Sequence, residues 1–353
     1  MTDRPWTDDQ ARWVFRGAAT LARAGAEPVG PLVLPTAHFF PDRFEGDAES
    51  VGRLFDRLKS HVGLSDIPTA VLVTDPEDGS IVSSCSSGGC STSAIKTLAG
   101  ERVTAQRGGS YAIQVATSEL KNPTVLTTVL TRAIGGVFMQ EADVLSSFPG
   151  RERAAAADLA ATMLGLGVLV ANGSGIEVKG CGGVKVHSAT SMGAAQATLA
   201  LAVAIEREKL QRPANLTPTP ALLKGLDPVA RALLAMAIAF VEHNRGVVRR
   251  IDDAPEPVAA GHFTLKEPGA SLGALFGEPV RRLLRVLGFG APNKDADPLD
   301  ELEREAALGT ARPRKALLAS NGAASGAEQS RVARTSDKAR LAEIRALVDE
   351  SFE

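Results

Sequence analysis

Apolar residues recur at helical spacing along much of the chain, and the clearest case spans residues 122–138. Its apolar face comprises Leu126, Val129, Leu130, Ala133, Ile134, Val137 and Phe138. Asn122 and Pro123 precede this face, and they form an N-cap residue followed by the proline favoured in a first helical turn. The pattern therefore predicts a buried helix that begins after Asn122.

Five further segments are predicted to form helices from their apolar spacing, alanine content or capping residues. They are residues 7–25, 48–62, 154–167, 191–211 and 228–244. The first has the sharpest start, because Thr7 and Gln10 have the spacing of a capping box.

Extended patterns replace helical ones between residues 68 and 120. Residues 70–73 are consecutive apolar residues, and residues 111–116 alternate as a half-buried strand does. Between them, Asp78-Gly79 is a hairpin turn signal before a short apolar stretch at residues 80–83. This part of the chain is therefore expected to supply a small sheet.

Together these patterns predict an α+β fold, predominantly helical, in which a helix pair packs beside a small sheet. We expect one domain over residues 1–290, with a strand-rich part at 68–120 and a helical part at 122–245. Residues 291–334 are rich in Ala, Gly, Ser and charged residues, which is typical of a flexible linker. Residues 335–353 have the spacing of an amphipathic helix, a candidate docking element for a protein partner.

The composition argues against several classes of function. The 353 residues carry a formal net charge of −2, so neither nucleic acid nor an anionic membrane is expected as a partner. The chain opens without a signal-peptide pattern, and no uncharged run has the length of a membrane span. Three cysteines in a chain this long favour a reducing compartment. A soluble, cytoplasmic protein is the expectation.

The helix at 122–138 and the helix that starts near Ala154 resemble the two core helices of gluzincin-type zinc metallopeptidases. The segments Leu32-Val-Leu-Pro-Thr and Phe39-Phe-Pro-Asp resemble the lead-in of uncharacterised bacterial proteins that carry an intact HExxH motif. A strand at 111–116 precedes the first helix, as in those proteins. The resemblance is diffuse and covers residues 25–210.

The resemblance implies a position for each part of the zinc site. In a zincin, two histidines at i and i+4 bind the zinc ion and a glutamate between them is the general base. Aligned on the surrounding residues, the histidine positions are Arg132 and Gly136, and the base position is Ala133. The third ligand, a glutamate, falls at Ala154, and Asp158 is the aspartate that orients the first histidine. None of the replacing side chains binds zinc.

A scaffold without these ligands implies a zincin-like pseudoenzyme that has no catalytic residue and no cofactor and serves as a binding or structural module. The emptied site is expected to form a close helix contact between Gly135-Gly136 and the small residues 154–157. Asp158 lies in an apolar run and needs a partner, for which Arg132 is the nearest candidate. An ordinary buried helical hairpin is the alternative interpretation of the same pattern.

A second candidate site, of a different class, is built from thiols. Cys85, Cys90, Cys181 and His187 lie in two Gly-rich loops and have the ligand types of a structural zinc site. The same cysteines could instead be free thiols, or Cys85 and Cys90 a disulfide. A cysteine nucleophile with His187, His61 or His38 as its base is a further alternative, although no local signature of a known hydrolase surrounds any cysteine.

Overall fold

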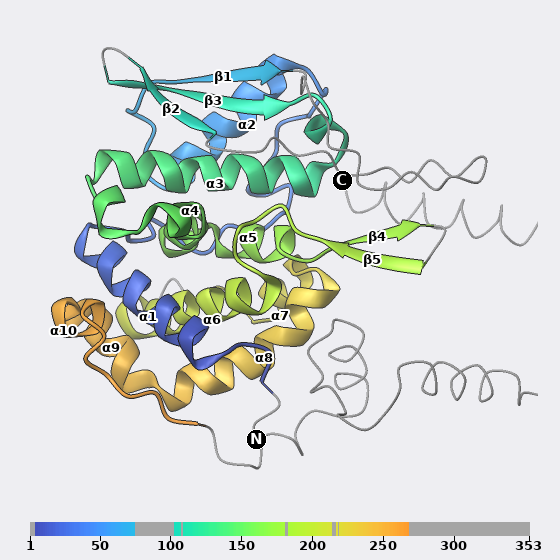
Figure 1. Cartoon of the computed structure of the whole chain (residues 1–353). Helices are drawn as coiled ribbons and strands as arrows, with labels where there is room; N and C mark the ends of the chain where they lie inside the picture. The colour runs from blue at the N-terminus through green and yellow to red at the C-terminus, as the bar shows by residue number, and fades with distance from the viewer. Residues whose placement is uncertain are drawn as a thin grey trace, which may run out of the picture. The chain divides into compact units, whose positions relative to one another are not determined.

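A computed structural model describes residues 4–74, 102–106, 109–180, 183–213, 217 and 219–267, with the backbone alone for residues 177–186. All of them belong to one compact unit, Met1–Ala291. The described chain is an α+β fold dominated by helices, as the sequence predicts (Figure 1). The turn signal at Asp78-Gly79, the stretch at 80–83, the linker and the C-terminal amphipathic segment all lie outside the described residues.

A three-stranded sheet forms one end of the fold and contains β1 (Thr69–Thr74), β2 (Val103–Gln106) and β3 (Ser110–Ala116). The strand order is β1-β3-β2, with β1 parallel and β2 antiparallel to the central strand. The helices α2 (Ala48–His61) and α3 (Pro123–Glu141) lie directly beneath this sheet (Figure 1).

The remaining helices continue away from the sheet in further layers. Helix α3 packs on its other side against α4 (Arg153–Ala161) and α5 (Gly167–Gly173). Below them lie α1 (Asp8–Arg23) and α6 (Ala194–Gln211), and α6 packs in turn against α8 (Pro228–His243). The shorter elements are α7 (Thr219–Gly225), α9 (Arg245–Asp253), α10 (Pro255–Ala259) and the 3₁₀ turns Glu119–Lys121, Leu145–Ser147 and Gly150–Glu152.

Local capping signals are confirmed where the structure describes them. The Thr7 side chain accepts from the Gln10 amide, and the Gln10 side chain accepts from the Thr7 amide, so the capping box is complete. Asn122 Oδ1 accepts from the Val125 amide at 3.1 Å, which starts α3 where the sequence predicts. These bonds satisfy amides that a helix leaves free in its first turn.

Two strand pairings were not expected from the sequence. β2 has only 4 residues and pairs with β3 from Val103 opposite Ile113. The strands β4 (Ile176–Gly180) and β5 (Gly183–His187) form an antiparallel hairpin that projects from the helices, where the sequence predicts a Gly-rich loop (Figure 1). Short strands are recognised poorly from sequence because pairing with a neighbour, rather than a long apolar pattern, stabilises them.

A kink divides the second helix of the expected pair. Between α4 and α5, residues Thr162–Leu166 form a π-helical turn in which Gly165 has φ of 102°. The whole helical stretch Gly150–Gly173 has 24 residues and a mean hydropathy of 1.8 in its most apolar window, a length and composition that would suffice to cross a membrane. However, 83% of that window is buried inside the fold, which is the position of a core helix.

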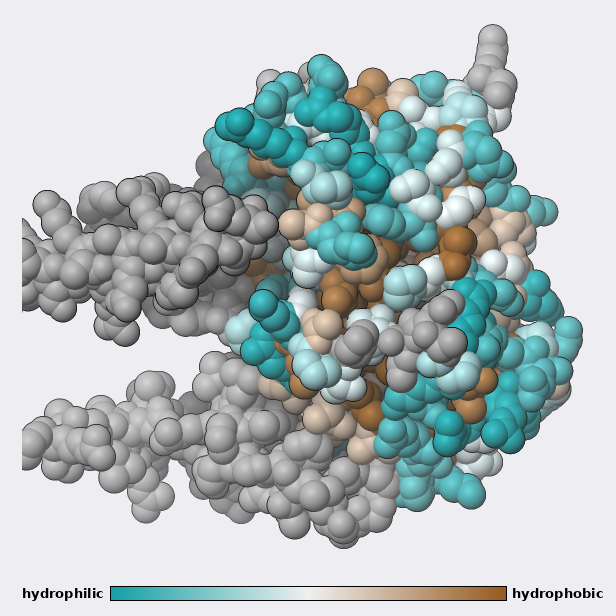
Figure 2. Space-filling view, turned by 180° about the vertical axis from the view of Figure 1, so that it is seen from behind, coloured by the Kyte–Doolittle hydropathy of each residue, from teal (hydrophilic) through white to brown (hydrophobic). Residues whose placement is uncertain are grey.

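Exposed large apolar side chains are scattered over the described surface. They are Val29, Phe44, Leu72 and Leu223, and each lies on a different segment. The face seen from behind is polar over most of its described area, with small apolar groups between the polar residues (Figure 2). Isolated apolar side chains of this kind are normal on a protein surface and do not by themselves mark an interface.

Candidate functional site

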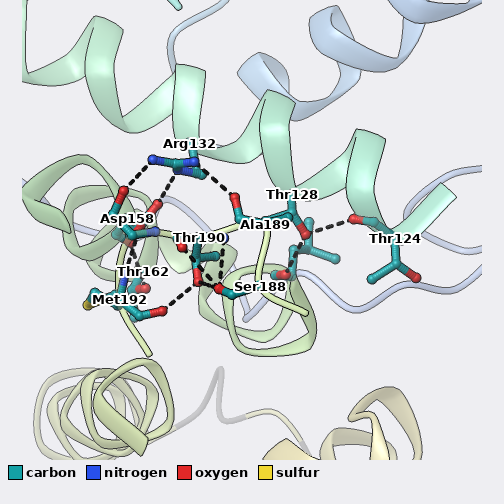
Figure 3. A network of polar contacts seen from close by, with 11 residues as sticks. Thr124, Thr128, Arg132, Asp158, Thr162, Ser188, Ala189, Thr190 and Met192 are labelled. Atoms are coloured by element: carbon teal, nitrogen blue, oxygen red, sulfur yellow. Dashed lines mark hydrogen bonds and ion pairs between the residues drawn. The ribbon is translucent and has the colours of Figure 1, made fainter. Parts of the chain in front are cut away.

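An ion pair joins the two helices that the sequence singles out. Arg132 on α3 places Nε 2.6 Å from Oδ1 of Asp158 on α4. The Asp158 side chain is completely buried, whereas 19% of the Arg132 side chain remains exposed. The contact expected between these two residues is therefore confirmed (Figure 3).

The loop between β5 and α6 completes the site. The amides of Ser191 and Met192 donate to Asp158 Oδ2 at 2.6 and 3.0 Å. Arg132 donates through its two terminal nitrogens to the Ala189 carbonyl at 2.9 Å and to Ser191 Oγ at 2.7 Å. Three segments that are distant in sequence thus converge on one carboxylate and one guanidinium group (Figure 3).

The loop itself is held by its own hydroxyl groups. Ser188 Oγ accepts from the Thr190 amide at 3.2 Å, and Thr190 Oγ1 donates to the Met192 carbonyl at 2.6 Å. These bonds order the backbone whose amides face Asp158. Short polar side chains stabilise turns in this way because they reach nearby backbone groups.

The electrostatic balance of the pair keeps Asp158 charged near neutral pH. Burial raises the pKa of Asp158 to about 6, while Arg132 and the amide donors of Met192 and Ser191 act in the opposite direction. A carboxylate with this pKa is mostly ionised at pH 7. Its negative charge is then balanced by one guanidinium group and two backbone dipoles.

Close packing of α3 on α4 is confirmed at Gly135. A Cβ atom at this position would lie 1.9 Å from the Ala157 carbonyl oxygen, a distance that no side chain tolerates. The absence of a side chain at Gly135 lets the two helix backbones approach closely. The expected contact of small residues therefore exists, with Gly135 and Ala157 at its centre.

Two other residues of the expected contact lie elsewhere. Gly136 faces the sheet, where an added Cβ would meet the Val103 side chain of β2 at 3.0 Å. Ala154 is exposed at the start of α4. Their inclusion in the α3–α4 contact was wrong, because successive residues of a helix point about 100° apart and only one of two neighbouring glycines can face α4.

The three positions assigned to zinc ligands and the one assigned to the general base have no side-chain donor atom for a metal. Arg132 is cationic, Ala133 is buried at 2% exposure, and Gly136 and Ala154 carry no polar side-chain atom. Within the described ranges, no group of three or more His, Cys, Asp or Glu side chains could hold a metal ion. The arrangement holds two helices and a loop together through charge.

The thiol site remains a prediction. Cys85, Cys90 and Cys181 lie outside the described residues, and His187 is the last residue of β5, opposite Ile176. His61, a candidate base, has its Nε2 3.0 Å from the Phe39 carbonyl oxygen and its ring beside those of Phe39 and Phe40. Because a carbonyl oxygen only accepts, Nε2 is the donor here, and Nδ1 is the ring nitrogen that could act as a base.

Sequence reasoning identified both charged residues of the site but not the loop that joins them. Residues 188–193 read Ser-Ala-Thr-Ser-Met-Gly before an Ala-rich helix. This run of small, mostly polar residues is a signal for an ordered loop directly before that helix. That loop meets Asp158 through backbone amides, which no side-chain motif reveals. No protein-family model, curated protein or solved structure matches the chain.

Proposed function

We propose that this chain is a metal-independent pseudoenzyme with a zincin-like helix pair, and that it acts as a binding or structural module. The observation that carries the proposal is the buried contact between Asp158 and Arg132. By the resemblance, these are the positions of the orienting aspartate and of the first zinc-binding histidine. An aspartate of that kind fixes a ligating imidazole by accepting its second N–H.

An arginine in place of the first zinc-binding histidine satisfies the charge of the buried Asp158 carboxylate. Asp158 is fully buried, and a buried carboxylate needs a compensating charge and donors. Arg132 supplies a fixed positive charge that does not depend on metal supply or on pH. It also binds the loop at Ala189 and Ser191, so that one side chain ties α3 to the segment before α6. Such a cross-link supports a scaffold that retains its shape without zinc.

The first test is metal content. Full-length protein purified without chelators should contain well below one zinc ion per chain by inductively coupled plasma mass spectrometry, and it should not hydrolyse unstructured peptide substrates. About one zinc per chain that is lost on substitution of Cys85, Cys90 and Cys181 by serine would contradict the proposal and support the thiol site. Protein purified after growth with added zinc is the control for metal supply.

The second test rebuilds the site. Arg132→His, Ala133→Glu, Gly136→His and Ala154→Glu would restore the four zincin side chains, with Val103→Ala to make room beside residue 136. We expect the combined variant to bind about one zinc ion per chain, because all three ligands of a gluzincin site are then present.

The matched control retains Ala154 and should bind zinc far more weakly, since it lacks the third ligand. A combined variant that is folded by circular dichroism yet binds no zinc would refute the zincin-like arrangement. That result would not bear on the proposal that the natural protein binds no metal, so the two parts of the proposal are tested separately.

A further inference from the structure

Glu208 is a buried carboxyl group that the site described above does not use. It lies near the end of α6, is only 3% exposed, and neither of its oxygens accepts or donates a hydrogen bond in the described structure. Buried polar atoms nearly always have a partner, and an unpaired buried charge is costly. A group of this kind therefore requires an explanation.

A small cavity of about 10 Å³ lies at Glu208. Its wall includes Thr162 and Gly165 of the π-helical turn and Pro28 and Leu32 of the segment that follows α1. This volume is enough for roughly one water molecule. The cavity thus has space for a water molecule but not for an organic ligand.

The charged groups around Glu208 are already engaged. Arg207 donates from Nε to Asp252 of α9 at 3.0 Å and also contacts the Ala26 carbonyl oxygen. Arg212 donates to the Pro28 carbonyl and approaches Glu27 at 3.4 Å. The π-helical turn Thr162–Leu166 contains no charged residue. Burial raises the pKa of Glu208 to about 7, and the positive charge of Arg212 opposes this shift.

Hydrogen bonds join the segment that follows α1 to the π-helical turn and to Thr217. The Val33 amide donates to the Gly165 carbonyl at 3.0 Å, and the Leu32 amide donates to Thr217 Oγ1 at 3.2 Å. A Cβ atom on Gly165 would lie 3.3 Å from the Pro28 side chain, so this segment lies tightly over the kink. π-helical turns are frequent at functional positions.

We propose that Glu208 makes this contact proton-dependent: residues 26–34 stay closed over α6 and the kink while the carboxyl group is protonated, and they open more often once it ionises. In the closed form an ionised Glu208 has no free cation to pair with among the described groups that surround it. On opening, bulk water replaces the single water molecule that the cavity can hold and stabilises the charge of the carboxylate.

The direction follows from proton linkage. The pKa of Glu208 is about 7 when the contact is closed and near the ordinary value of 4.5 when the group is solvated. The closed form thus binds the proton more tightly, so closure is strongest below about pH 4.5 and weakens as the pH rises to about 7. Within this interval the equilibrium constant for closing falls by up to roughly tenfold per pH unit.

Amide hydrogen exchange of the full chain tests the proposal at the Val33 amide. After correction for intrinsic exchange, protection at Val33 should fall more than tenfold between about pH 5 and about pH 8, while protection of Ile134 in α3 reports global unfolding. Glu208→Gln should abolish the change at Val33. Glu242→Gln, which alters an exposed carboxylate of α8, is the matched control and should behave as the natural protein.

Equal pH dependence in the natural protein and in Glu208→Gln would overturn the proposal. A carbon NMR titration of the Glu208 carboxyl group in the natural protein gives an independent result that does not require a variant to fold. A midpoint near 7 would support the proposal, whereas a midpoint near the ordinary value of 4.5 would refute it.

Discussion

Arg132→Met should destabilise the folded protein by about 3 kcal/mol at neutral pH. The methionine side chain keeps much of the arginine's length but leaves the fully buried Asp158 carboxylate without its countercharge. It also removes the donors to Ala189 and Ser191. Urea unfolding followed by circular dichroism measures the loss, and an unchanged slope with denaturant would show that the change is one of stability.

The loss should depend on pH in a defined direction. Burial raises the pKa of Asp158 to about 6 even beside Arg132, so removal of the guanidinium raises it further. The variant's folded state then binds a proton that the unfolded state releases, and its stability falls as pH rises from about 4 through that raised pKa. The destabilisation should therefore be smaller at about pH 5 than at about pH 8.

Asp158→Asn is the matched variant on the other side of the pair. An asparagine oxygen can still accept from the Ser191 and Met192 amides, and the partly exposed Arg132 can reach water. This change should cost less than Arg132→Met, and the double variant should be more stable than the sum of the single losses predicts. Additive losses would mean that the two charges do not stabilise each other.

Gly135→Ala should destabilise the folded protein by about 2–3 kcal/mol or more. An alanine Cβ would meet the Ala157 carbonyl oxygen at 1.9 Å, so the backbones of α3 and α4 would have to separate. That separation would also strain the Arg132–Asp158 pair on the same two helices. Thermal and urea unfolding measure the effect.

Two other glycines serve as matched controls. Gly136→Ala lies in the same helix but meets only the end of the Val103 side chain at 3.0 Å, so the gain in helix propensity should offset most of the cost. Gly52→Ala in α2 meets nothing within 4 Å and should stabilise by about 0.5–1 kcal/mol. A Gly135→Ala variant as stable as these two would show that α3 and α4 do not pack as closely as described.

Some features of the candidate site can be predicted from the residue pattern, and others cannot. Asp158 could be recognised as needing a partner because a carboxylate within an apolar helix is costly, and Arg132 followed from the pairing of the two helices. The orientation of Gly136 could not be inferred, since adjacent glycines face different neighbours and only the placement of β2 decides which. The burial of the Glu208 carboxyl group without a hydrogen-bond partner could not be predicted either. That burial depends on a segment that precedes Glu208 by about 180 residues.

By itself, the sequence determined the features that arise from neighbours within one or two helical turns. These include the capping box at Thr7, the start of α3 at Asn122 and the overall predominance of helix, because capping bonds and apolar periodicity are local. The tertiary structure alone decided the pairing of β2, the β4–β5 hairpin and the delivery of the Ser191 and Met192 amides to Asp158. These depend on backbone groups that carry no side-chain signal and meet only when distant segments pack.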